Sequence, residues 1–362
     1  MTKPFVINSV PCYSEAPIST ELLQMNSQEF IEAVHRIEAA EKHILIPRQE
    51  KGLVNKIMEL AGGLIDVIPV DGEYGFSYRN ATAVARVLRG EKPIPDGMEE
   101  PVVLRTVEEL LSDSHKQVMI DCGNGKLKRL PLDRTMNAME ILNLCGCDDA
   151  KAICFGYPMS ILVRADDQDV KLDMTTDFIT VIDKDDCVLD RLTSITYKYI
   201  RECCGRCVYG YEGATQIHSM LSDITQKKGM PEDINLLSEL SKVMLNQTLC
   251  DIGASMARLV LSALEQFRPE IEFHITKRAC LAGVCRKLVT FHILPERCIG
   301  CGDCMEVCED DAIEGKKKYI HIIDQGECIQ CGECMEACPH NAIVTAGTIK
   351  PKCPKKPIPY EG

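Results

Sequence analysis

Cysteines near the C-terminus have the spacing of ligands for an iron–sulfur centre. The pattern C-x2-C-x2-C-x3-C occurs twice, thirty residues apart, in Cys298, Cys301, Cys304, Cys308, Cys328, Cys331, Cys334 and Cys338. Two intervening residues allow a loop to wrap three thiolates around one face of an iron–sulfur cube. A pair of zinc knuckles is the alternative, but zinc sites take four ligands in two pairs rather than two interlocked triplets. The pattern therefore favours two iron–sulfur clusters.

The doubled run resembles that of bacterial two-cluster ferredoxins, in which the fourth cysteine of each run binds the cluster of the other run. The resemblance implies one 4Fe-4S cluster on Cys298, Cys301, Cys304 and Cys338. It implies a second 4Fe-4S cluster on Cys328, Cys331, Cys334 and Cys308. Residues 298–345 also carry ten acidic side chains against three lysines. An acidic surface suits docking to a basic partner, although a solvated face explains each carboxylate equally well.

The composition limits the class of protein. The chain has 362 residues, 45% hydrophobic and 26% charged, as expected for a globular protein of two or three domains. It has 21 cysteines, no signal-like N-terminus and no apolar stretch of roughly 18 residues, so we expect a cytoplasmic protein with no transmembrane segment. A formal charge of −13 and the absence of tryptophan argue against nucleic acid as a partner.

The hydrophobic pattern before the cysteine runs predicts a multidomain chain of α/β and α+β type. Residues 1–112 alternate strands and helices, as a small parallel sheet requires, at 5–10, 27–40, 43–47, 50–63, 65–70 and 79–90. Residues 113–190 place short β-rich segments around one helical segment, 135–146, which predicts a β-grasp-like α+β module.

The second half of the chain changes to helical periodicity. Residues 191–270 hold four amphipathic segments joined by short loops, which predicts an antiparallel bundle of helices at 194–204, 214–226, 233–245 and 255–267. A linker at 271–293 leads to the two-cluster domain at 294–345. The tail at 346–362 is rich in proline and lysine and is expected to be extended.

The sequence ECCGRCVYGYEG, followed by TLCDIG, resembles the flavin subunits of NADH dehydrogenases and bifurcating hydrogenases. In that family three cysteines of the first motif and one of the second hold a 4Fe-4S cluster. Cys204, Cys207 and Cys250 match the motif, whereas Gly210 stands at the third position of the triplet. Cys203 replaces the usual serine and is a candidate ligand, but adjacent cysteines cannot both bind without bending the loop. The resemblance implies a third, altered cluster; buried structural thiols are the alternative.

The segment between the helices and the cysteine runs places His274, Cys280 and Cys285 close together in sequence. Imidazole and thiolate are good ligands for a borderline-soft ion. In related hydrogenase subunits such a group, with a cysteine matching Cys187, holds a structural zinc at a hinge. The resemblance therefore implies a zinc site; a surface histidine and two core cysteines are the alternative.

The N-terminal part also resembles the flavin subunits and related electron-input subunits, with VINSVPCYSEAP in the place of an acidic loop. Backbone N–H groups and glycines hold phosphates in such proteins. The glycine-rich loop that cradles FMN and nicotinamide phosphates is absent from these residues, and we expect it to precede the point where this chain begins. We therefore expect a truncated, degenerate flavin-subunit core without a nicotinamide site and without FMN.

The preferred hypothesis is an electron-transfer subunit of a cytosolic multi-subunit oxidoreductase, relaying electrons between a partner's active site and another carrier. Soluble ferredoxin is a candidate carrier, and oxygen-sensitive clusters suggest an anaerobic setting. One alternative is an FMN-containing subunit that oxidises NAD(P)H. Another is a zinc-stabilised scaffold. No side-chain constellation predicts a catalytic residue.

Overall fold

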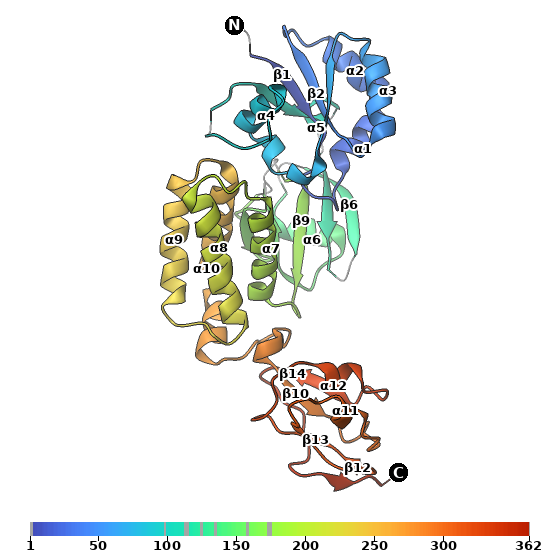
Figure 1. Cartoon of the computed structure of the whole chain (residues 1–362), viewed down its shortest axis with the longest axis vertical. Helices are drawn as coiled ribbons and strands as arrows, with labels where there is room; N and C mark the ends of the chain where they lie inside the picture. The colour runs from blue at the N-terminus through green and yellow to red at the C-terminus, as the bar shows by residue number, and fades with distance from the viewer. Residues whose placement is uncertain are drawn as a thin grey trace. The chain divides into compact units, whose positions relative to one another are not determined.

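The computed structural model describes residues 3–97, 99–111, 116–123, 126–133, 136–156, 159–171 and 176–361 (Figure 1). The chain divides into two compact units. The first comprises Met1–Lys184, Ser194–His218 and Asn235–Gln266. The second comprises Asp185–Thr193, Ser219–Ile234 and Phe267–Gly362. The division falls within each of the four long helices in the second half of the chain.

The first unit begins with a parallel sheet of four strands in the order β3-β2-β1-β4. The strands are β1 (Phe5–Asn8), β2 (Lys42–Pro47), β3 (Asp66–Val70) and β4 (Val103–Thr106). The helices around it are α1 (Ile18–Met25), α2 (Ser27–His35), α3 (Lys51–Ala61), α4 (Ala81–Leu88) and α5 (Val107–Leu111). The predicted alternation of strands and helices is present. Strand β4 and helix α1 were not predicted, because short segments give a weak periodic signal.

Helices cover both faces of this sheet. Side chains of a strand point alternately to opposite faces, and in β2 Ile44 packs with Phe30 and Ile57 of α2 and α3. Leu45, the next residue, packs with Val84 of α4 on the other face. A strand that is buried on both faces has a nearly continuous apolar sequence, as the segment HILIP of β2 shows.

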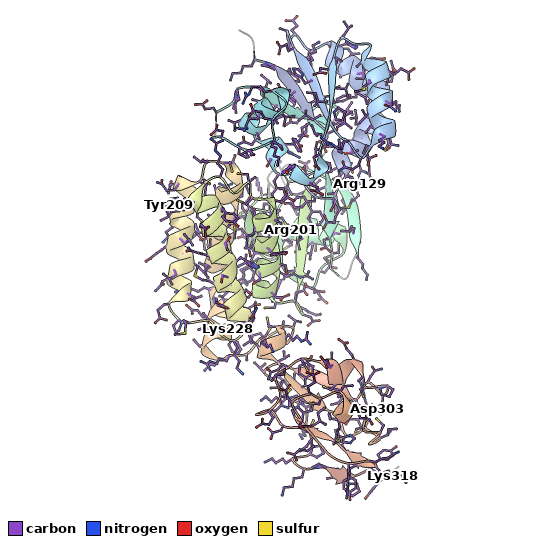
Figure 2. All side chains as sticks on the ribbon, viewed as in Figure 1. Arg129, Arg201, Tyr209, Lys228, Asp303 and Lys318 are labelled. Atoms are coloured by element: carbon purple, nitrogen blue, oxygen red, sulfur yellow. The ribbon has the colours of Figure 1, made fainter. Side chains whose placement is uncertain are left out.

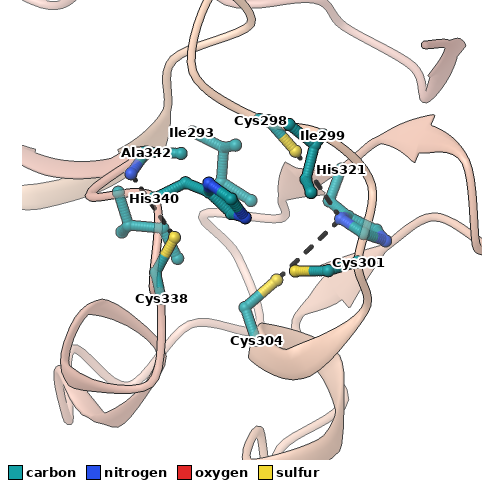
Figure 3. A pocket seen from close by; sticks show the side chains of 10 residues that line it. Ile293, Cys298, Ile299, Cys301, Cys304, His321, Cys338, His340 and Ala342 are labelled. Atoms are coloured by element: carbon teal, nitrogen blue, oxygen red, sulfur yellow. Dashed lines mark hydrogen bonds between the residues drawn. The ribbon is translucent and has the colours of Figure 1, made fainter. Parts of the chain in front are cut away.

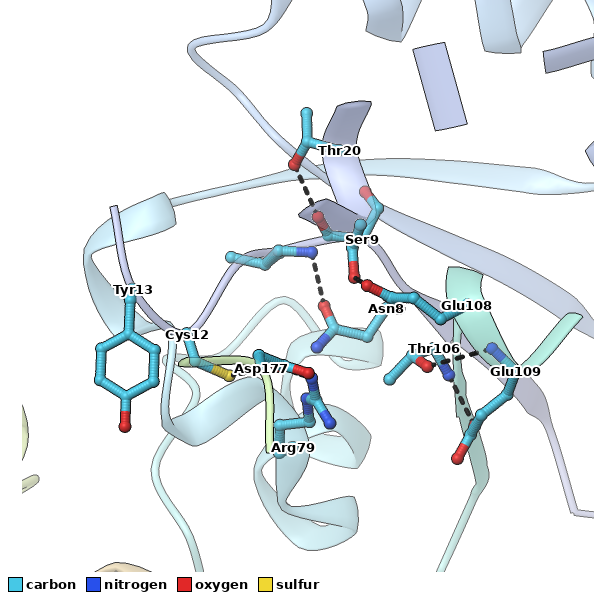
Figure 4. Close-up of polar contacts among 12 residues, drawn as sticks. Asn8, Ser9, Cys12, Tyr13, Thr20, Arg79, Thr106, Glu108, Glu109 and Asp177 are labelled. Atoms are coloured by element: carbon cyan, nitrogen blue, oxygen red, sulfur yellow. Dashed lines mark hydrogen bonds and ion pairs between the residues drawn. The ribbon is translucent and has the colours of Figure 1, made fainter. Parts of the chain in front are cut away.

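Polar side chains gather where β1 ends (Figure 4). Thr20 Oγ1 donates a hydrogen bond of 2.8 Å to the carbonyl oxygen of Ser9. Farther along, Arg79 forms an ion pair with the buried Asp177, and Cys12 Sγ lies 3.7 Å from the same carboxylate. The two contacts with Asp177 join the parallel-sheet module to the next module of the first unit.

That next module is a mixed five-stranded sheet in the order β6-β5-β9-β7-β8. Its central pair, β5 and β9, is parallel and its other pairs are antiparallel. Its elements are β5 (Lys116–Asp121), β6 (Leu127–Leu132), α6 (Ala138–Cys145), β7 (Ala150–Phe155), β8 (Ile161–Arg164) and β9 (Phe178–Asp183). Ile141 and Leu142 of α6 pack with the sheet in one core. The arrangement agrees with the α+β module expected here, with β6 as an unpredicted strand.

Four helices follow, as the helical periodicity predicted. They are α7 (Val188–Glu202), α8 (Val208–Thr225), α9 (Asp233–Gln247) and α10 (Asp251–Thr276). Helix α10 is longer than expected and has non-helical backbone angles at Phe267, two residues before Pro269. Proline removes a backbone donor and clashes with the preceding turn, which explains a kink at this point.

The second unit holds the cluster module, residues 290–346, in which short strands surround the cysteine runs. The paired strands are β10 (Thr290–Ile293) with β14 (Ile343–Ala346), β11 (Ile313–Glu314) with β13 (Ile322–Ile323), and β12 (Tyr319–Ile320) with β15 (Ile358–Pro359). Two short helices, α11 (Asp303–Glu306) and α12 (Glu333–Glu336), each carry one cysteine. The expected extended tail also contributes β15, which pairs with β12. None of the described helices combines the length and the apolar character needed to cross a membrane.

Candidate metal centres

One cavity of the cluster module is lined by four sulfur-bearing side chains (Figure 3). Cys298, Cys301 and Cys304 come from the first run, and Cys338 comes from the second. The remaining lining is mainly apolar and includes Ile293 of β10 and Ile343 of β14. The structure thus brings together the four residues expected to hold the first cluster, including the one that is distant in sequence.

A second cavity of the cluster module has the complementary set of cysteines. Cys328, Cys331 and Cys334 of the second run line it together with Cys308 of the first. Its apolar lining includes Phe291 and Ile313. Each cavity therefore draws three cysteines from one run and the fourth from the other.

The two runs fold in the same way because the same short-range hydrogen bonds recur. The amide of Met305 donates to the carbonyl of Gly302 at 2.9 Å, and that of Met335 donates to Gly332 at 3.0 Å. Both glycines have positive φ angles, 102° and 84°, which only glycine adopts without steric cost. Each glycine thus lets the loop turn into a short helix that carries the third cysteine of its run, Cys304 or Cys334.

Burial and crowding disfavour deprotonation of the third cysteine of each run, Cys304 and Cys334. Burial, with the neighbouring thiols second, raises the pKa of Cys304 to about 12. The same causes raise the pKa of Cys334 to about 11. Iron ions would replace the thiol protons and offset the mutual repulsion of the thiolates.

A histidine that the sequence interpretation missed lies beside the first cavity. His321 is 1% exposed, and its Nδ1 lies 3.8 Å from Cys298 Sγ and 3.9 Å from Cys304 Sγ. Its Nε2 is buried and finds no hydrogen-bond partner among the described residues. A neutral imidazole carries one proton, so the tautomer protonated at Nδ1 avoids an unsatisfied buried donor. The local sequence YIHII gives no signal for this contact, because it depends on the packing of β12 and β13.

The candidate third site lies in the first unit, between α7 and α8 and at the start of α10. Cys250 is 8% exposed, and burial, then the neighbouring Cys204 and Cys207 among other causes, raises its pKa to about 11. Cys203 Sγ lies 3.3 Å from the carbonyl oxygen of Gly210. A Cβ atom added at Gly210 would lie 2.5 Å from Cys207 Sγ. The sulfur of Cys207 thus fills the space that the side chain of a cysteine at position 210 would need.

In the second unit, four donors expected to bind zinc converge in a buried group, called here the Cys187 group: Cys187, His274, Cys280 and Cys285. Their donor atoms all lie within 4.8 Å of one another. His274 Nε2 lies 3.2 Å from Cys187 Sγ, and the two sulfurs of Cys187 and Cys285 are 3.6 Å apart. His274 Nδ1 lies 2.7 Å from the carbonyl oxygen of Glu270. That contact leaves Nε2 directed toward the thiols, as in the outer-shell contacts of zinc-binding histidines.

Without a metal ion, the crowded donors of the Cys187 group shift one another's protonation, so that a bound ion would have to displace protons from His274 and Cys285. Burial lowers the pKa of His274, but contacts with Cys187 and Cys280 outweigh burial and raise it to about 10. Contacts with Cys187 and Cys285 strongly lower the pKa of Cys280. Thiolate and imidazole nitrogen are the ligands of structural zinc, and four of them complete a tetrahedral shell. The residues present therefore fit a closed zinc site.

Comparison with known families identifies two regions of the chain. Residues 190–274 match the model for the NADH-ubiquinone oxidoreductase-F iron-sulfur binding region. Residues 297–348 match the model for the 4Fe-4S dicluster domain. The resemblance to the flavin subunits and to two-cluster ferredoxins is thereby confirmed over these regions. The first match contains the candidate third site, and the second contains both cysteine runs.

Curated relatives match parts of the chain. The NADP-reducing hydrogenase subunit HndC of Solidesulfovibrio fructosivorans is 33% identical over 189 residues, 49% of this chain and 39% of the relative. The mitochondrial NADH-ubiquinone oxidoreductase 51 kDa subunit of Neurospora crassa is 28% identical over 112 residues, 31% of this chain and 23% of the relative. This chain thus spans less than half the length of these relatives.

A solved structure with a similar fold is the NAD+-reducing [NiFe]-hydrogenase in the H2-reduced state, with a TM-score of 0.63. The match covers 76% of this chain and 57% of the hydrogenase chain at 15% sequence identity. At this identity the match shows a shared fold. The chain is therefore a mixed α/β multidomain protein with a helical region and a C-terminal two-cluster domain, related in part to subunits of hydrogenases and NADH dehydrogenases.

Proposed function

We propose that this protein is an iron–sulfur electron-transfer subunit of a multi-subunit cytoplasmic oxidoreductase. The observation that carries the proposal is the pair of cavities in the cluster module, each lined by three cysteines of one run and one of the other. When bound, 4Fe-4S clusters supply one-electron transfer over a range of potentials set by their surroundings. The family matches at residues 190–274 and 297–348 support an electron-transfer role.

The chain's own residues would hold and insulate the two clusters. Cys304 and Cys334 belong to one apolar core, which also contains Phe291 and Ile313. Apolar side chains exclude water and lower the local dielectric constant around the thiolates. A shared core would also fix the separation of the two clusters, because packed interiors deform little. Two clusters held in one small module suit a relay of single electrons.

The surface of the cluster module suits a basic partner. All ten acidic side chains at residues 298–345 are exposed. Asp303, on α11, and Lys318, before β12, lie on this surface (Figure 2). Complementary charge steers association and fixes orientation more than it adds affinity. We propose a basic face of a partner subunit, or of a soluble carrier, as the docking surface.

The test is purification of the full chain under anaerobic conditions from its native source. Iron and acid-labile sulfide should be counted, and co-purifying chains identified. Two clusters require about eight iron atoms and about eight sulfides per chain. A third cluster on Cys203, Cys204, Cys207 and Cys250 would add about four of each. A chain that is folded but free of iron and sulfide would overturn the proposal.

An FMN-containing subunit that oxidises NAD(P)H is the alternative, favoured by a cavity of about 490 Å³ in the first unit. Its lining includes Cys12 and Glu15 of the CYSEAP segment and Lys198 and Arg201 of α7. This volume is within the range of small-molecule sites. Stoichiometric flavin in the purified chain, with cluster reduction by NAD(P)H, would decide for the alternative. Flavin-free protein whose clusters are not reduced by NAD(P)H would decide against it.

Zinc bound by the Cys187 group is a further part of the proposal. Such an ion would close a tetrahedral shell without redox activity and stabilise the second unit. A zinc-stabilised scaffold without any redox role is the remaining alternative. It predicts zinc without iron or sulfide, so the same metal count separates it from an electron-transfer subunit.

A further inference from the structure

A second compact group of sulfurs lies in the five-stranded module of the first unit, away from the cysteine motifs. Its members, called here the Cys145 group, are Cys122, Cys145 and Cys147. Their three sulfur atoms all lie within 4.8 Å of one another. Cys145 is buried, whereas Cys122 and Cys147 are partly exposed.

The local backbone brings these cysteines together. Cys145 is the last residue of α6, and Gly146 follows with a left-handed φ of 65°. The amide of Cys147 donates to the carbonyl of Leu142 at 2.9 Å, and that of Gly146 donates to Asn143 at 3.1 Å. These two bonds form a Schellman motif, which reverses the chain at the end of a helix. The motif therefore directs Cys147 back beside Cys145.

Cys122 reaches the same place from the sheet. It follows β5 directly, and its amide donates to the carbonyl of Lys126 at 2.9 Å where the chain turns toward β6. Cys145 belongs to the core of the module, and Cys122 and Cys147 pack against the edge of that core. Two rigid elements, a helix end and a strand end, thus fix the three sulfurs, as a preorganised metal site requires.

The spacing of the sulfurs selects a single ion. With a Zn–S bond of about 2.3 Å, two thiolates on one tetrahedral zinc ion lie about 3.8 Å apart. Thiolates on separate iron atoms of a cluster lie farther apart because iron atoms and sulfides intervene. Donor atoms gathered within 4.8 Å therefore suit one ion held by three thiolates.

A positive side chain lies beside the group. Lys128 of β6 donates a hydrogen bond from its ammonium group to the carbonyl oxygen of Cys145. Three thiolates and one divalent cation carry a net charge of −1, which a nearby ammonium offsets. Lys128 would therefore be a positioning residue for the site rather than a ligand.

We propose that Cys122, Cys145 and Cys147 form a binding site for one thiophilic metal ion, with Zn2+ as the expected occupant. Three protein ligands leave the fourth tetrahedral position of zinc open to a small ligand or water. The same three thiolates also suit Cu(I), a softer ion. The partial exposure of Cys122 and Cys147 gives the ion a path from solvent.

The test compares the full chain, with its iron–sulfur sites loaded, to the variant Cys122→Ser/Cys145→Ser/Cys147→Ser. Each protein is incubated anaerobically with Zn2+, passed through a desalting column and analysed for bound zinc. The triple variant should lose about one zinc per chain. Cys154→Ser, in β7 of the same sheet and outside the group, is the matched control and should lose none. Equal zinc in the wild-type chain and the triple variant would overturn the proposal.

A measurement on the wild-type chain keeps the test decisive if the triple variant does not fold. Zn2+ should protect the partly exposed Cys122 and Cys147 together from alkylation, with the partly exposed Cys353 as the unprotected reference. Alkylation of Cys122 and Cys147 at rates that Zn2+ does not change, or a Cys145–Cys147 disulfide in the zinc-treated chain, would contradict the proposal. Titration with Cu(I) and with Zn2+ then shows which ion the wild-type chain binds more tightly. Binding of either ion at this site should be lost in the triple variant.

Discussion

The thiols of this chain are gathered in two different ways. In the cluster module, four cysteines line each of two cavities, and among these described residues no three sulfurs gather within 4.8 Å of one another. In the Cys187 and Cys145 groups, the donor atoms instead lie within 4.8 Å of one another. The first arrangement suits a polynuclear cluster and the second a single ion. Sulfur spacing thus separates chemistries that cysteine content alone does not.

The largest effect is expected from a substitution in the cysteine runs of the cluster module. Cys301→Ala should remove about four iron atoms per chain and unfold the cluster module, because ligation supplies folding energy that a small apolar core does not replace. Iron analysis, EPR and circular dichroism of the anaerobic protein measure both losses. Cys353→Ala, outside the runs in the tail of the same unit, is the control and should keep full iron. An intact two-cluster EPR signal in Cys301→Ala would contradict the ligand assignment.

Cys250→Ser tests whether the candidate third site, at α7, α8 and the start of α10, holds an iron–sulfur cluster as the two cavities of the cluster module are proposed to do. If it holds a third cluster, the variant should lose about four iron atoms and one EPR signal while both signals of the cluster module remain. The four helices should stay folded, because the change replaces a single sulfur atom by oxygen just before α10. Unchanged iron content and spectra would identify Cys250 as a buried structural thiol.

Cys280→Ser tests the compact arrangement of the Cys187 group. The variant should lose about one zinc per chain and lower the thermal stability of the second unit, since structural zinc contributes folding free energy. Zinc analysis and thermal unfolding give the two readouts. Cys353→Ser serves as the matched control. Retention of all zinc, with unchanged thermal stability, would show that the group is not a metal site.

The smallest effect is expected from a substitution of His321, which lies beside the first cavity of the cluster module and should change the potential of that cluster alone. His321→Leu removes an N–H donor beside Cys298 and Cys304, so the potential of the first cluster should become more negative. A hydrogen bond of about 1 kcal/mol corresponds to roughly 40 mV for a one-electron couple. An EPR-monitored redox titration measures the shift. His292→Leu is the control, because the imidazole of His292 contacts a hydroxyl group rather than a cysteine: its Nε2 lies 2.7 Å from Thr290 Oγ1. Equal shifts in both variants would argue against a specific contact.

Much of the fold could be predicted from local sequence patterns. HILIP in β2 and the amphipathic segments of α7 to α10 have strong periodic signals, and the structure contains these elements. Strands β4 and β6 were missed because their stability depends on neighbouring strands rather than on their own periodicity. The kink at Phe267 could have been anticipated from Pro269, which prevents a regular helix.

The sequence by itself determined the identity and spacing of the candidate ligands in the two cysteine runs, because the spacing within a loop limits which thiolates can face one centre. Only the tertiary structure decided which distant donors converge. Cys122 joins Cys145 and Cys147 because a strand end packs beside a helix end, and His321 approaches two cysteines because β12 and β13 pack over the first run. Such contacts depend on packing between elements, which local spacing does not encode.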